Sequence, residues 1–124
     1  MPGQKNKKKS RNHPLREGKG SMYEGGLRVP FIGVGPNIKP GSICREPVTG
    51  LDLFPTIADL ASYSLELPNN LDGGSLKNLL QNQGRGNIQR INPFLIFHQA
   101  VARKAQTSLR LGDFKLINTW DGGR

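Results

Sequence analysis

The residue of this sequence best suited to chemistry is Lys19, which lies between Gly18 and Gly20. A lysine ammonium is a compact positive charge, and flanking glycines let the backbone come close to a ligand. A cation on such a loop suits the binding of a small oxyanion. The alternative, a solvated loop lysine with no ligand, stays open on this tripeptide alone.

A phosphate-binding P-loop is excluded at this lysine. That motif requires a glycine upstream of the Gly-Lys pair and a Ser or Thr directly after the lysine. Here His13 and Pro14 stand upstream, and Gly20 follows Lys19.

The element expected to position this loop is a strand over residues 27–35, entered through Glu24 and Arg28. Its residues are mostly β-branched or aromatic, and Gly35-Pro36 is a stop signal. Because proline cannot donate a ladder hydrogen bond, Pro30 should lie near the start of the strand or at a bulge.

An amphipathic helix is predicted from Asp52 to about Ser62, because apolar residues recur there at spacings of three and four. Thr49 and Asp52 resemble a capping box, although Asp52 could itself be the N-cap. Asp52 and Asp59 are expected to cap and solvate this helix. A second short helix is predicted over residues 75–81.

The C-terminal third reads as strands. Residues 93–97 predict one strand, and residues 107–111 and 114–119 alternate around Gly112-Asp113, which suits a type I′ or II′ hairpin turn. The order of elements predicts an α/β structure followed by a small antiparallel sheet.

Composition limits the core that the chain can bury. Only 35% of the 124 residues are hydrophobic, against 16 Gly and 9 Pro, so an independent fold is not assured. Cys44 is the only cysteine, which excludes an internal disulfide and indicates a bystander thiol. The sequence shows neither a signal peptide nor an apolar run long enough to span a membrane.

The positive charge is concentrated near the N-terminus. Residues 1–20 hold seven Lys or Arg against one Glu, which is +6 of the net +9. We expect residues 1–13 to be a disordered basic arm. A small basic nucleic-acid-binding protein is the alternative that this arm raises. It is disfavoured because the Lys5–Lys9 run has no interleaved aromatic residues.

Longer strings make the sequence similar to the sulfatases, the arylsulfatase-type members of the alkaline phosphatase superfamily. The matching segments follow the family's order and cover about residues 12–120. They are Pro14–Ile32, Gly33–Gly41, Thr49–Ala61, Leu71–Leu76 and Ser108–Ile117. The resemblance implies a fragment of the alkaline-phosphatase-like sulfatase fold. Residues 14–83 would be the C-terminal part of the catalytic α/β domain, and residues 84–124 the start of a C-terminal subdomain with a β-hairpin.

The resemblance also implies roles for individual residues. Lys19 would be catalytic and substrate-binding, because its ammonium can stabilise charge on the leaving oxygen of a sulfate ester. His98 resembles a family histidine that faces the pocket mouth, with a structural role as the alternative. His13 is a candidate substrate contact, with a plain surface histidine as the alternative. Glu24 and Arg28 would fix the loop through a charged pair or backbone hydrogen bonds.

The sequence departs from the family in ways that bear on activity. Sulfatases make a formylglycine nucleophile from a Cys or Ser in a C/S-x-P/A-x-R motif, which is absent here, and Cys44 does not qualify. The family's calcium ligands are absent too, so we expect no metal site in this chain. The resemblance therefore implies an inactive piece, with both ends cut from a longer enzyme.

That longer parent would need calcium and formylglycine to hydrolyse a sulfate ester, and would be periplasmic or secreted. No membrane partner is expected, and a nucleic-acid partner is disfavoured. A phosphatase or phosphonate hydrolase of the same superfamily is the remaining alternative within enzymes.

Overall fold

The computed structural model describes residues 12–100 and 105–120, which belong to two compact units. The sheet unit comprises the described residues of 12–30 and 94–120, and the helix unit comprises residues 31–93. Each unit is considered by itself. The proposed domain boundary at residues 83–84 concerns a longer enzyme and stays a prediction.

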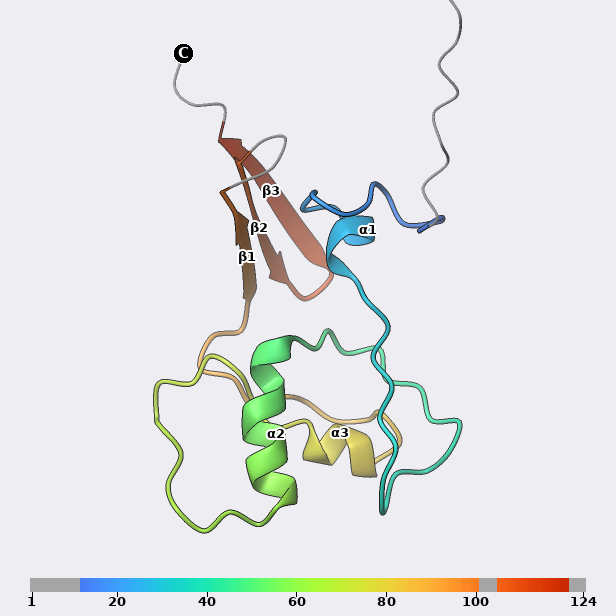
Figure 1. Ribbon diagram of the computed structural model, residues 1–124, viewed down its shortest axis with the longest axis vertical. Helices are drawn as coiled ribbons and strands as arrows, with labels where there is room; N and C mark the ends of the chain where they lie inside the picture. The colour runs from blue at the N-terminus through green and yellow to red at the C-terminus, as the bar shows by residue number, and fades with distance from the viewer. Residues whose placement is uncertain (1–11, 101–104, 121–124) are drawn as a thin grey trace, which may run out of the picture. The chain divides into compact units, whose positions relative to one another are not determined.

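The sheet unit is a three-stranded antiparallel sheet with the order β1-β2-β3 (Figure 1). Its strands are β1 (Leu95–Gln99), β2 (Ala105–Leu111) and β3 (Phe114–Trp120). Leu111 pairs with Phe114, so Gly112 and Asp113 form a two-residue turn. Only Gly112 has a positive φ, 56°, which fits a type II′ turn rather than type I′. The predicted hairpin is confirmed, and the strand predicted over residues 93–97 is β1, displaced by two residues.

The two faces of this sheet differ because successive side chains of a strand point to opposite sides. One face contacts the helix α1 (Glu24–Leu27) and the loop before it, through side chains of all three strands. These contacts come from Gln99, Gln106, Ser108, Arg110 and Lys115. The other face carries exposed apolar side chains, among them Ile96, Leu116 and Trp120.

The helix unit contains three short helices joined by loops (Figure 1). They are η1 (Gly50–Asp52), α2 (Leu53–Leu60) and α3 (Lys77–Gln81). The predicted capping box is confirmed, since the backbone N–H of Thr49 donates to Oδ2 of Asp52 at 2.7 Å. The first predicted helix, α2, ends at Leu60 rather than at Ser62. Ser62 has a φ of +53°, which a right-handed helix cannot include. The second begins at Lys77 rather than residue 75.

The prediction that the side chain of Asp52 is solvated is wrong, because this side chain is fully buried. Arg90 forms a two-pronged ion pair with it, Nε to Oδ1 at 2.8 Å and Nη2 to Oδ2 at 2.7 Å. The backbone N–H of Gly74 donates to Oδ1 at 3.0 Å. Asp52 therefore joins the start of α2 to two later loops. Asp59, in contrast, is exposed as predicted, with its carboxylate on Lys77 and Ser75.

A hydroxyl next to Asp52 extends this network. Thr56 is buried, and its Oγ1 donates to the Asp52 carbonyl at 2.5 Å while accepting from the Leu76 N–H at 2.8 Å. A Cβ added to Gly73 would lie 2.1 Å from the Leu51 carbonyl oxygen. The turn at residues 71–76 thus packs directly on the backbone at the start of α2.

The strand predicted over residues 27–35 is wrong for this structure. Leu27 is the last residue of α1, and no regular element follows until Gly50. Val29, Ile32 and Val34 are 80%, 84% and 93% exposed. The apolar pattern describes a segment that suits a sheet, but a strand needs a neighbour for its ladder. Among the described residues, the strands β1, β2 and β3 pair only with one another.

The core is as thin as the composition predicts. Among the described residues, the buried apolar side chains are Met22, Pro55, Leu76 and Leu79. No helix of the described part is long and apolar enough to cross a membrane. Most of the expected disordered arm, residues 1–11, lies outside the described residues. Asn12 does not fit that expectation, since its Nδ2 donates to the Gly25 carbonyl at 2.7 Å.

Replacing Asp52 by Asn should lower the stability of the helix unit by about 3–5 kcal/mol, because the guanidinium of Arg90, whose side chain is only 13% exposed, would lose its buried counter-charge. Burial raises the pKa of Asp52, but the hydrogen bonds from Arg90, Gly74 and Thr49 outweigh it and hold that pKa below its ordinary value. The stabilisation is therefore present above the unfolded pKa of about 4 and is lost as the pH falls through the lower, folded value. D52N should flatten that acid limb. Amide hydrogen exchange in α2 between neutral and acid pH measures both effects.

Asp59→Asn, in the helix α2 that follows directly, is the matched control. Its side chain is 43% exposed, so loss of its pair with Lys77 should cost less than about 1 kcal/mol. Equal losses in D52N and D59N would contradict the central role of Asp52.

Candidate functional site

The loop that carries Lys19 is held in place through its backbone. Lys19 is exposed and lies in a turn with Gly20, whose φ is +90°. The following helix packs on the loop so closely that a Cβ on Gly26 would lie 2.1 Å from the Ser21 carbonyl oxygen and 2.7 Å from that of Gly18. Hence only glycine fits at residue 26.

Gly25 makes an equally close approach. Its N–H donates to the Arg16 carbonyl at 2.9 Å, and a Cβ there would lie 2.2 Å from the Glu17 carbonyl oxygen. The guanidinium of Arg16 also stacks on the ring of Tyr23 at 4.0 Å from its centroid, a cation–π contact. The glycine pair therefore allows α1 to pack against the loop backbone both before and after Lys19.

Glu24 ties this helix to the sheet. Its Oε1 accepts from Nζ of Lys115 on β3 at 2.6 Å, and its Oε2 lies 3.6 Å from Nη1 of Arg110 on β2. Arg28 approaches Oε2 at 3.9 Å, and its N–H donates to the Glu24 carbonyl at 2.9 Å. The predicted charged pair is confirmed, but the closer partner is Lys115, which lies 91 residues away in sequence.

These cations set the charge state of Glu24. Partial burial raises the pKa of this carboxyl, but the hydrogen bond and charge of Lys115, with the charges of Arg110 and Arg28, outweigh it. The pKa of Glu24 therefore lies below its ordinary value, and the carboxylate stays ionised at neutral pH.

The other side of the loop is attached to the sheet by side-chain amides. The N–H of Met22 donates to Oε1 of Gln106 at 3.2 Å, and Nε2 of Gln99 donates to the Gly20 carbonyl at 3.4 Å. Met22 is buried, with its Sδ 3.8 Å from Oγ of Ser108. Sequence reasoning missed both glutamines, because only the strand register brings them to this loop.

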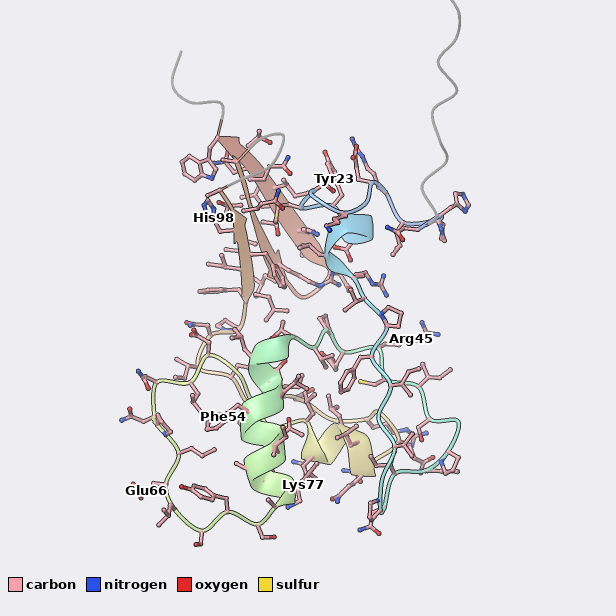
Figure 2. All side chains as sticks on the ribbon, in the orientation of Figure 1. Tyr23, Arg45, Phe54, Glu66, Lys77 and His98 are labelled. Atoms are coloured by element: carbon pink, nitrogen blue, oxygen red, sulfur yellow. The ribbon has the colours of Figure 1, made fainter. Side chains whose placement is uncertain are left out.

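The structure does not bring His98 to this loop. Gln99, the next residue of β1, points to the loop, so His98 points to the opposite face of the sheet. Its Nδ1 lies 2.8 Å from Oγ1 of Thr107, which also accepts from Nε1 of Trp120 at 2.7 Å. Figure 2 shows His98 on β1, with Tyr23 beside α1. The structural alternative therefore has specific contacts here, and a substrate role for His98 stays a prediction.

His13 is exposed and lies within the turn at residues 12–14, which the side chain of Asn12 attaches to the Gly25 carbonyl. An open groove of about 350 Å³ lies nearby, lined by Asn12, Leu15, Arg28, Val29 and Pro30. Neither His13 nor Lys19 lines it.

Chemically, the arrangement offers one exposed ammonium on a backbone-restrained loop. Such a group can hold an anion, whereas bond cleavage also needs a nucleophile. Within the described residues, no cluster of three or more His, Cys, Asp or Glu could hold a metal ion.

Residues 17–122 match the family described as N-sulphoglucosamine sulphohydrolase, C-terminal. This range includes Lys19, the glycine pair, the Asp52 network and all three strands. The chain belongs to the sulfatase family, and it corresponds to part of the C-terminal region of its members.

Individual relatives agree. The chain is 40% identical over 88 residues to the steryl-sulfatase of Mus musculus, which is 70% of this chain and 14% of that protein. It is 36% identical over 108 residues to arylsulfatase K of Mus musculus, or 82% of this chain and 19% of that protein. A sulfatase of Formosa agariphila is 38% identical over 78 residues, 60% of this chain and 14% of its own length.

The chain thus spans less than a fifth of the length of these relatives. No solved structure matches it. The family is shown by sequence, and the architecture established here is a small α/β arrangement with a three-stranded antiparallel sheet.

Replacing Gly26 by Ala should displace the Lys19 loop, because the added methyl would overlap two backbone carbonyls. Overpacking of this kind costs about 1–3 kcal/mol. The amide resonances of residues 18–21 in a ¹⁵N spectrum should shift and broaden.

Gly50→Ala is the matched control, since a Cβ there meets no atom within 4 Å. It should leave stability unchanged or raise it by up to about 1 kcal/mol. A Gly26→Ala spectrum that kept the wild-type positions for residues 18–21 would show that the close packing is not required.

Proposed function

We propose that this chain supplies the sulfate-binding lysine of a sulfate-ester hydrolase, with Lys19 as the residue that contacts the sulfate group. The single observation that carries the proposal is the loop of Lys19, which the chain's own backbone and sheet restrain while the ammonium stays exposed. Membership of the sulfatase family supports sulfate as the anion. The surrounding fold in a longer enzyme would be that of the alkaline phosphatase superfamily.

The chemical role of Lys19 follows from charge. As the S–O bond of a sulfate ester breaks, negative charge grows on the leaving oxygen, and a positioned ammonium stabilises it without reorganising. In a complete enzyme, loss of such a group would lower kcat about 10²- to 10³-fold. Calcium and a formylglycine nucleophile belong to the proposal for the longer enzyme only, as do a periplasmic or secreted location and His13 or His98 as further substrate contacts.

Titration of the ¹⁵N-labelled chain with sodium sulfate, at ionic strength held constant with chloride, tests the binding role. The amides of residues 18–20 should shift in a saturable way. Lys19→Gln should weaken binding by about ten- to hundredfold, because a hydrogen bond to a charged group contributes about 1.5–3 kcal/mol.

Lys39→Gln is the matched control, since it removes the same charge from another exposed lysine, on a different turn. Equal weakening by K19Q and K39Q would mean that sulfate senses only net charge and would overturn the proposal. Inorganic phosphate in the same titration separates the alternatives within the superfamily. Clearly tighter phosphate binding would favour a phosphatase or phosphonate hydrolase.

We further propose that the isolated chain does not turn over sulfate esters, since its sequence lacks the motif from which the nucleophile is made. Incubation with p-nitrophenyl sulfate, with and without calcium, should release no nitrophenol above the rate of a heat-treated sample. Release that K19Q abolishes would contradict the inactive assignment.

The nucleic-acid alternative instead requires duplex binding that falls steeply with salt and is lost when residues 1–11 are removed.

A further inference from the structure

We propose that Gln99 and Gln106 act together as positioning residues for Lys19, an inference that rests on the sulfate-binding role proposed above. The two glutamines are direct cross-strand partners in the register of β1 and β2. Their side chains therefore lie side by side on the sheet face that meets the Lys19 loop.

The two amide groups hold the loop from both sides of Ser21. Gln99 donates its Nε2–H to the Gly20 carbonyl at 3.4 Å, and Gln106 accepts the Met22 N–H on its Oε1 at 3.2 Å. Each bond spans a large separation in sequence, 79 and 84 residues. The sheet thereby restrains the backbone immediately after Lys19, on either side of the Ser21 carbonyl against which Gly26 packs.

Gln106 is itself fixed. The Met22 N–H can only donate, so it takes the Oε1 end of the amide, and Nε2 is left to donate to Oγ1 of Thr119 on β3 at 3.2 Å. Its acceptor therefore points at the loop and its donor at the sheet. Gln99 presents the opposite end, its donor, to the loop. The pair supplies one donor and one acceptor to two backbone groups of the loop.

The chemical consequence concerns the orientation of the ammonium. A lysine side chain has four rotatable bonds, so its charge is placed only as well as the backbone beneath it. Binding to a loop that must first become ordered is weaker by the cost of the ordering. The glutamine pair should remove that cost before the anion arrives, while touching neither the anion nor Lys19 itself.

Gln99→Met and Gln106→Met test the inference, because methionine keeps the length of the side chain and removes its amide. Each should raise the mobility of the amides of residues 18–22 in ¹⁵N relaxation and raise the apparent Kd for inorganic sulfate roughly two- to tenfold. The cross-strand resonances of β2 and β3 should keep their positions, which separates lost positioning from lost folding.

Glutamate distinguishes the two positions. Gln106→Glu retains the acceptor for Met22 and should keep the loop ordered, whereas Gln99→Glu places an acceptor against the Gly20 carbonyl and should loosen it. If loop mobility in both methionine variants equals that of the wild type, the positioning role is wrong. If K19Q leaves sulfate binding unchanged, the proposed function has failed first, and the positioning role fails with it even where the loop loosens.

Discussion

The buried carboxylate of Asp52 is the interaction on which the helix unit depends. Apolar burial in this unit is slight, with Pro55, Leu76 and Leu79 as its buried apolar side chains. A fully buried acid would be costly alone, but Asp52 receives a two-pronged guanidinium and backbone donors from two loops. Its geometry fixes where those loops meet. Polar directionality thus supplies the specificity that a small apolar core cannot.

The sheet unit repeats this solution with a different acid. Glu24 projects from a helix of four residues, too short to be stable by itself, and is held by Lys115 and Arg110 of the sheet. In both units a pair of glycines admits close backbone contact next to the acid, Gly25-Gly26 in one and Gly73-Gly74 in the other. The acid and the glycine pair work together, because a charged group can bridge two segments only where their backbones are allowed to approach.

The sequence predicted what is encoded locally. The capping box of Thr49 and Asp52 and the hairpin around Gly112 each depend on residues only a few positions apart, and both are present. The distant partners of these local features were not predicted. Arg90 lies 38 residues from Asp52, and nothing in the sequence around Arg90 indicates that it pairs with this carboxylate. The resemblance to a family pattern predicted roles for Glu24 and Lys19, but it predicted none for the two glutamines that hold the loop.

The failure over residues 27–35 has a different cause. An apolar, β-branched sequence indicates that a segment is suited to a sheet, but a strand also needs a neighbouring strand for its backbone hydrogen bonds. Among the described residues no strand pairs with this segment, and Val29 to Val34 remain exposed. The Lys19 loop is the contrary case, because each restraint on it comes from residues of this chain: the glycine pair, Gln99, Gln106 and the sheet that orders them. The position of Lys19 therefore does not depend on whether residues 27–35 form a strand. The loop is thus restrained by its own segment and sheet although residues 28–35 form no strand, and for this reason the chemical role that we propose rests on the lysine loop and not on the apolar run beside it.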